Sequence, residues 1–163
     1  MNDNELTYSI EPKTTTRAHS EVWKNPQGEF FRMNGPARII RFSDMNIREV
    51  WYQIPGMRHR VNGPAIIEYD EKGVIIYEKW YTNGINYNPN GPSFIIYRSN
   101  SSSRLKNLHG LDVILGITQK AVSIEKWTDK KGRLHREDGP AVIIYEPDET
   151  IKYQVSFLNG EKV

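Results

Sequence analysis

Short apolar runs alternate with polar, turn-forming segments along the whole chain. Four of these runs follow a Gly-Pro pair and are rich in β-branched and aromatic residues, as in "AIIEY" and "AVIIY". This composition is typical of β-strands, and proline is tolerated at the first residue of a strand. Alternate side chains of a strand share a face, so we expect Ala65, Ile67 and Tyr69 on one side of a sheet.

The Gly-Pro pairs recur at a nearly fixed interval. The glycines are Gly35, Gly63, Gly91 and Gly139, so the first two intervals are 28 residues and the third is 48. A tryptophan lies 12 residues before this glycine in three copies and 11 residues before it in the third; these residues are Trp23, Trp51, Trp80 and Trp127. A shortened copy, "VSFLNGEKV", closes the sequence, with Phe157 expected in the place of the tryptophan. Such self-similarity indicates a repeat architecture.

Each unit is expected to contain about three antiparallel strands. After the Gly-Pro strand comes a second strand such as 74–82, then the Asn83-Gly84 turn, then a short strand at 85–87. The sequence therefore predicts an all-β, antiparallel meander of about 28-residue repeats that forms an elongated, twisted, solenoid-like sheet. One domain is expected over 1–163, with repeats at 20–47, 48–76, 77–98 and 124–150 and a partial repeat at 151–163. Stacked units are expected to bury a ladder of Ile, Tyr and Trp.

A segment at 99–123 interrupts the repeats. Leu105, Leu108 and Leu111 recur every third residue and Ile114 follows, which is close to a helical period. We expect a short helix or an apolar loop. Packing on the sheet as a lid is the favoured interpretation, and a partner-contact or dimerisation element is the alternative.

Composition narrows the class of protein. The chain has 163 residues, a net charge of +2 with acids and bases mixed throughout, 37% hydrophobic residues and no cysteine. Charge alone therefore does not indicate a nucleic-acid binder, and disulfides and thiolate metal sites are excluded. The start "MNDNELTYSI" lacks the pattern of a signal peptide, and the apolar runs are too short to span a membrane. We expect a soluble, cytoplasmic protein.

The pattern W-x(5)-G-x-x-H-R-x-D/N-G-P-A resembles the β-hairpin repeats of MORN type. It is most similar to the H-R-x-D-G-P-A repeats of small proteins of tailed bacteriophages. The resemblance covers about 20–98 and 124–160 and implies an elongated sheet that serves as an interaction surface. The chain departs from the pattern in two copies, where His-Arg is replaced by Phe31-Arg32 and Tyr87-Asn88.

The polar hexad of the fourth copy has the composition of an acid–base site. His135, Glu137 and Asp138 lie close together, but the equivalent residues of the second copy are His59, Val61 and Asn62. An active site is normally built once, so a motif that repeats with changing chemistry indicates a structural corner. We expect no catalytic residues, no cofactor and no metal site.

A row of basic side chains remains as a candidate binding site. Stacked repeats place equivalent positions in line, and the candidates are Arg32, Arg58, His59, Arg60, Tyr87, Arg133, His135 and Arg136. Such a row can hold an anionic ligand through arginine contacts and stacking. The competing interpretation is that the arginines pair with Glu29, Glu68, Glu125 and Glu137.

The favoured functional hypothesis is a non-enzymatic interaction protein. By the resemblance it is phage-encoded and binds or inhibits a host protein in the host cytoplasm. An open strand edge or the 105–117 segment is the expected contact, for a protein partner or for a homodimer. The alternative is a protein that sequesters a nucleotide or single-stranded nucleic acid through the Arg/His row. An enzyme is the least favoured hypothesis, and no membrane partner is expected.

Overall fold

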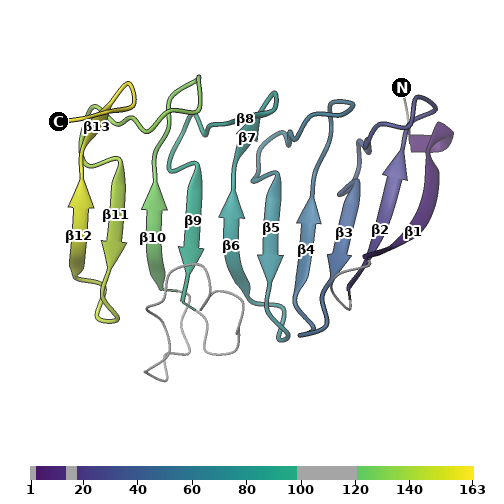
Figure 1. Ribbon diagram of the computed structural model, residues 1–163, viewed down its shortest axis with the longest axis horizontal. Coiled ribbons are helices and arrows are strands. Elements are labelled where there is room, and N and C mark those ends of the chain that lie inside the picture. The colour runs from purple at the N-terminus through teal and green to yellow at the C-terminus, as the bar shows by residue number, and fades with distance from the viewer. Residues whose placement is uncertain (1–2, 14–17, 99–120) are drawn as a thin grey trace.

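Ten strands form one antiparallel sheet that runs the length of the molecule (Figure 1). The structure is a computed structural model that describes residues 3–13, 18–98 and 121–163. A short 3-10 helix, η1 (Asp3–Glu5), precedes the sheet. In spatial order, the strands are β1 (Thr7–Lys13), β2 (Ala18–Lys24), β3 (Arg38–Arg41), β4 (Ile47–Val50), β5 (Ile66–Tyr69), β6 (Ile75–Lys79), β9 (Phe94–Tyr97), β10 (Val122–Lys126), β11 (Val142–Tyr145) and β12 (Ile151–Val155). The predicted all-β antiparallel meander is confirmed.

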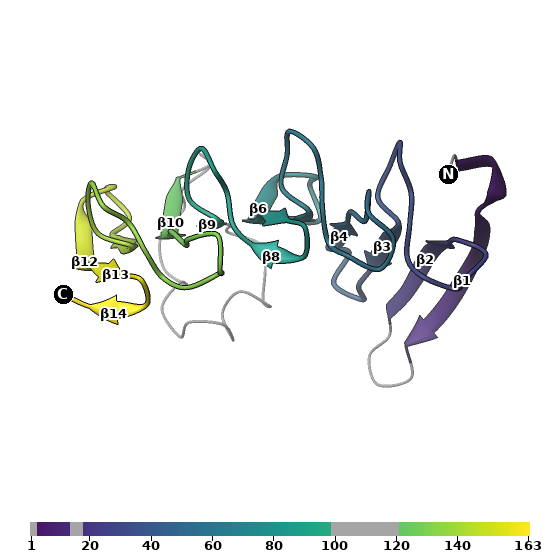
Figure 2. The same cartoon turned by 90° about the horizontal axis from the view of Figure 1, so that it is seen from above.

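Two small hairpins lie outside the main sheet. One joins β7 (Tyr81–Thr82) to β8 (Ile85–Asn86), and the other joins β13 (Phe157–Leu158) to β14 (Glu161–Lys162). Both turn at Asn-Gly: Asn83 and Gly84 have φ of 51° and 81°, the left-handed region that these residue types tolerate. The short third strand expected at 85–87 is therefore part of a separate hairpin, visible beside the sheet in Figure 2.

The 99–123 segment is mostly outside the described residues, and this includes Leu105, Leu108, Leu111 and Ile114. Its last residues belong to the sheet, because β10 begins at Val122 and Ala121 is buried. The 99–123 range therefore includes the first two residues of β10, Val122 and Ser123.

Strand register gives the two faces of the sheet different compositions. Directly paired residues of neighbouring strands share a face. On one face, the Trp-bearing strands contribute Glu and the Gly-Pro strands contribute Ile. This row from β2 to β12 is Glu21, Ile39, Glu49, Ile67, Glu78, Ile95, Glu125, Ile143 and Gln154. We call it the acidic row.

The opposite face carries aliphatic residues, cations and an aromatic ring. Its upper row is Val22, Arg38, Val50, Ile66, Lys79, Phe94, Lys126, Val142 and Val155. Two clusters pack here, one around Val50 and Ile66 and one around Ile96 and Ile124. We call this side the cationic face.

Candidate interaction surface

The arginine of each His-Arg-type motif is clamped within its own repeat. The Arg60 guanidinium lies over the Trp51 ring, with its Cζ 3.8 Å from the ring centroid, and Nη1 donates to the Pro64 carbonyl at 3.5 Å. Gly63 closes the clamp, because a Cβ at this position would lie 3.0 Å from Arg60 Nε. The Arg-x-x-Gly-Pro spacing therefore packs the guanidinium closely against the glycine. We call this unit the Arg–Trp corner.

The same corner recurs in the first and fourth copies. The Cζ of Arg32 lies 4.1 Å from the centroid of the Trp23 ring, and the Cζ of Arg136 lies 4.0 Å from that of the Trp127 ring. In the third copy, Asn88 takes the place of the arginine, and its Nδ2 donates to the Pro92 carbonyl at 3.1 Å. The departure of this copy from the H-R pattern thus preserves the contact to the proline carbonyl.

Three of the four tryptophans carry an arginine on one face, and none of the four belongs to a fully buried ladder. All four rings are half-buried, whereas Ala37, Ala65 and Ala141 in the adjoining Gly-Pro strands are fully buried. The expectation of a continuous buried Trp ladder was wrong for this reason.

The acids expected to neutralise the arginine row have other partners. Glu68 pairs with Arg48, Glu125 accepts from the Tyr145 hydroxyl, Glu29 accepts from Asn25, and Glu137 lies near His135. Arg136 does pair with an acid, but that acid is Asp138, whose pKa the guanidinium lowers by hydrogen bonding. Stacking on tryptophan, which sequence spacing did not reveal, is the main contact of these arginines.

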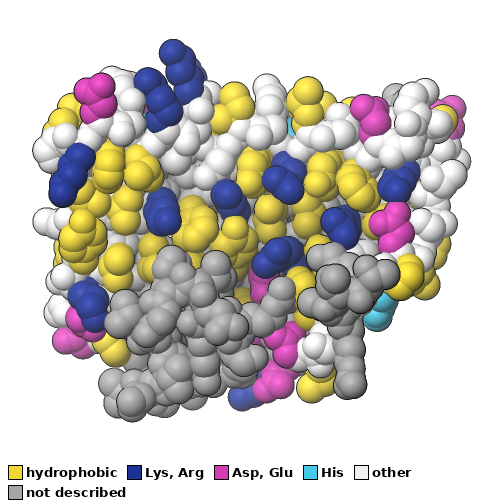
Figure 3. Space-filling model, in the orientation of Figure 1, with side chains coloured by type: hydrophobic (Ala, Val, Ile, Leu, Met, Phe, Trp, Pro, Cys, Tyr) yellow, Lys and Arg dark blue, Asp and Glu magenta, His cyan; other side chains and the backbone are white. Residues whose placement is uncertain are grey.

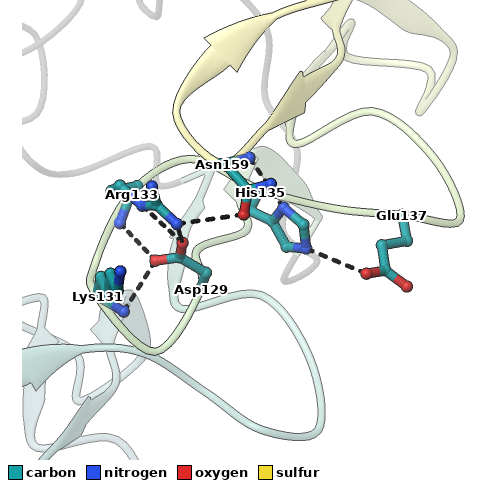
Figure 4. Close-up of polar contacts among 6 residues, drawn as sticks. All are labelled: Asp129, Lys131, Arg133, His135, Glu137 and Asn159. Carbon is teal, nitrogen blue, oxygen red and sulfur yellow. Dashed lines mark hydrogen bonds and ion pairs between the residues drawn. The ribbon is translucent and has the colours of Figure 1, made fainter.

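His59 and His135 connect consecutive repeats. The backbone N–H of Asn83 donates to His59 Nδ1 at 3.2 Å, and the N–H of Asn159 donates to His135 Nδ1 at 3.0 Å. Figure 4 shows His135 between Asn159 of the last hairpin and Glu137, whose Oε1 is 3.6 Å from Nε2. Each histidine therefore holds the Asn-Gly turn of the following unit. This explains why histidine occurs where an Asn-Gly hairpin comes next.

The other predicted site residues are distributed along the chain in the same way. Arg133 pairs with Asp129, with Nη2 2.6 Å from Oδ2, and also donates to the Asn159 side chain at 3.2 Å (Figure 4). Arg58 is exposed, and its Cζ lies 5.4 Å from the centroid of the Tyr81 ring. The backbone N–H of Tyr87 donates to the Trp80 carbonyl. The eight predicted residues thus lie along successive repeats, and most of them make hydrogen bonds, ion pairs or ring contacts with neighbouring residues.

The shortened last copy is aligned differently from the expectation. Val163 N–H donates to the Ser156 carbonyl, as His135 N–H donates to the Trp127 carbonyl. Ser156 therefore takes the place of the tryptophan, and Phe157 corresponds to the residue after it. The expectation that Phe157 replaces tryptophan was wrong by one position.

The acidic row is also engaged within the sheet. Glu21 accepts from Arg41 Nε at 2.9 Å, and Glu78 accepts from the Tyr97 hydroxyl at 3.1 Å. Burial raises the pKa of Tyr97, and the neighbouring Glu78 carboxylate raises it further. These contacts stabilise neighbouring strands.

The cationic face has a different balance. Its upper row holds Arg38, Lys79 and Lys126, and none of the ion pairs among the described residues involves these three. In register, Phe94 lies between the two lysines, with Lys126 Nζ 5.0 Å from its ring centroid. Figure 3 shows a face of the sheet on which Lys and Arg are dispersed over a broad hydrophobic area with few acids.

Aromatic rings accompany each of these cations. Lys79 Nζ is 5.2 Å from the Tyr81 centroid, and Arg38 Cζ is 5.7 Å from the Phe30 centroid. This row was not among the sites predicted from the sequence. A signal was present, since Lys79 and Lys126 directly precede their tryptophans and so face the opposite side of the strand.

Comparisons of the chain with protein-family models, curated proteins and solved structures find no match. Within residues 3–13, 18–98 and 121–163, no helix is long and apolar enough to cross a membrane. The same residues contain no group of three His, Cys, Asp or Glu arranged to hold a metal ion. The candidate interaction surfaces of the described residues are the two faces and the edges of the sheet.

Proposed function

We propose that the protein is a non-enzymatic β-repeat interaction module that docks an acidic surface of a protein partner on its cationic face. One observation carries the proposal: Arg38, Lys79 and Lys126 lie in one row without acidic partners among the described residues. Complementary charge steers association and fixes the register of a complex. The rings of Phe94 and Tyr81 supply the aromatic contact area that protein interfaces favour.

The corners are less suited to ligand capture than this face. The face of the Arg60 guanidinium already lies on Trp51 and its Nη1 donates to the Pro64 carbonyl, so an anion would compete for part of its N–H edge. Nδ1 of His59 and Nδ1 of His135 each already accept a backbone N–H of the following repeat, which fixes the ring. These competing contacts argue against nucleotide capture there, and they also give His135 a structural use in place of an acid–base role.

A protein partner fits the face better than a nucleic acid does. Lys79 and Lys126 are two strands apart, which is about 10 Å, and Arg38 is three strands from Lys79, which is about 14 Å. Val50, Ile66 and Val142 occupy other positions of the same row. Nucleic-acid interfaces are much more densely positive, whereas protein interfaces combine an apolar centre with a few charges. The resemblance to bacteriophage repeats favours a host protein as the partner.

Binding to a fluorescein-labelled polyglutamate peptide, followed by anisotropy at low salt, tests the proposal. We expect the double variant Lys79→Glu/Lys126→Glu to weaken binding by about tenfold or more. The matched control is Lys72→Glu/Lys131→Glu, which changes the net charge equally at two exposed turn positions. Equal loss in both variants would refute a localised site. Tighter, lysine-dependent binding of a thymidine oligonucleotide would instead assign the face to nucleic acid.

A further inference from the structure

The outer edge of β12 is an open and apolar strand edge. β12 is the last strand of the sheet, and no strand of the described residues pairs with its outer side. Ile151 and Tyr153 on this strand are 53% and 50% exposed. Unpaired edges with exposed apolar side chains are templates for pairing with another strand.

The opposite edge, β1, also exposes apolar side chains, with Tyr8 and Ile10 52% and 60% exposed, but its backbone is less able to pair. β1 contains Pro12, which has no N–H to donate to a further strand. β1 also carries Glu11, which pairs with Lys24 on β2. β12 has no proline, and its one charged residue, Lys152, is held by Glu146 at 3.0 Å. Of the two edges, β12 is the one without a proline and without an acidic residue, so it is better suited to accept a strand.

The last repeat also differs from the others at two positions, one in β12 and one directly after it. In the acidic row, the other Trp-type strands present Glu21, Glu49, Glu78 and Glu125, whereas β12 presents the neutral Gln154. At the tryptophan position the last repeat has Ser156. The last repeat therefore lacks the tryptophan that an Arg–Trp corner requires.

We propose that β12 pairs with β12 of a second copy of this chain, antiparallel, about a two-fold axis at Gln154. In this register, Gln154 faces Gln154 of the second copy, and Tyr153 faces Val155. Like charges directly opposite each other destabilise an antiparallel pair, so the glutamate of the other repeats would oppose this contact and glutamine permits it. The exposed Tyr153 gains an apolar neighbour. The interface is isologous, as most homodimer interfaces are.

The pairing keeps both cationic faces on one side. The two-fold axis of an in-plane antiparallel strand pair is perpendicular to the sheet, so equivalent faces of the two copies point the same way. The dimer therefore doubles the length of the cationic face. The dimer proposal does not depend on the function of that face.

Sedimentation equilibrium of the full chain tests the proposal through charge pairing. We expect a concentration-dependent monomer–dimer equilibrium for the wild type and a dissociation constant at least about tenfold weaker for Gln154→Glu and for Gln154→Lys alone. An equimolar mixture of the two variants is expected to restore the dimer, because glutamate then faces lysine. Gln154→Glu gives β12 the residue of the other repeats, so its melting temperature serves as a folding control.

Three results would overturn the dimer proposal. One is a wild-type chain that stays monomeric at all concentrations. Another is a mixture of the two variants that associates no better than either variant alone. The third is a dimer that survives both Gln154 substitutions but dissociates with Ile10→Glu on β1, which would place the contact at the other edge.

Discussion

Replacing Arg60 with alanine removes the centre of one Arg–Trp corner, and we expect it to destabilise the folded protein by about 1–3 kcal/mol. A cation over a tryptophan face contributes about 1 kcal/mol at a partly buried site. The Nη1–Pro64 hydrogen bond is long at 3.5 Å and adds at most about 1 kcal/mol. The alkyl stem of Arg60 also covers part of the Trp51 ring, so its loss exposes apolar surface.

Circular dichroism during thermal and urea unfolding measures this effect. For a protein of this size, about 1–3 kcal/mol corresponds to a fall in Tm of roughly 2–12 °C. Arg60→Asn is the matched variant, because Asn88 shows that asparagine can reach the proline carbonyl of a corner. We expect Arg60→Asn to be less destabilising than Arg60→Ala. An Arg60→Ala protein with the Tm of the wild type would refute a structural role for the arginine.

Three further changes probe other contacts of the sheet. His135→Ala removes the acceptor of the Asn159 N–H and is expected to cost only about 0.5–1 kcal/mol, with faster amide exchange confined to the 157–162 hairpin; unchanged exchange there would contradict the repeat-linking role. Glu68→Gln leaves the half-buried Arg48 without its buried carboxylate and is expected to cost about 2–3 kcal/mol by urea unfolding, whereas a neutral result would show that the pair is dispensable. Burial raises the pKa of Tyr77 from its ordinary 10.0 to about 12, so the folded state keeps a proton that the unfolded chain loses first. Stability is then intact below pH of about 10 and falls as pH rises from about 10 towards 12, and Tyr77→Phe should reduce this slope in urea midpoints; an identical slope would count against the burial effect.

The strands and turns could be predicted because their signals are local. The Gly-Pro strand starts and the Asn83-Gly84 turn follow from backbone preferences that neighbouring residues reveal. The period of 28 residues then fixed the stacking of repeats. Alternation within a strand also placed Ala65 and Ile67 on one face, which the register confirms.

The contacts of the corners could not be predicted because they cross a loop. Arg60 reaches back to a ring nine residues earlier, and only the folded loop brings the two together. Sequence spacing suggested acids as the arginine partners, but their strands place Glu68 and Glu125 elsewhere in the sheet. Dispersed charge in the sequence likewise concealed the cationic face, since Lys79 and Glu78 are neighbours in the chain and point to opposite sides.

The central claim is that the corners hold the repeats together while the cationic face binds the partner. Measuring both Tm and polyglutamate affinity for Arg60→Ala and for Lys79→Glu/Lys126→Glu tests it most directly. The account predicts that the corner variant loses Tm and keeps its affinity, and that the face variant loses its affinity with a smaller fall in Tm. A corner variant that loses affinity at unchanged Tm, beside a face variant that binds normally, would contradict it.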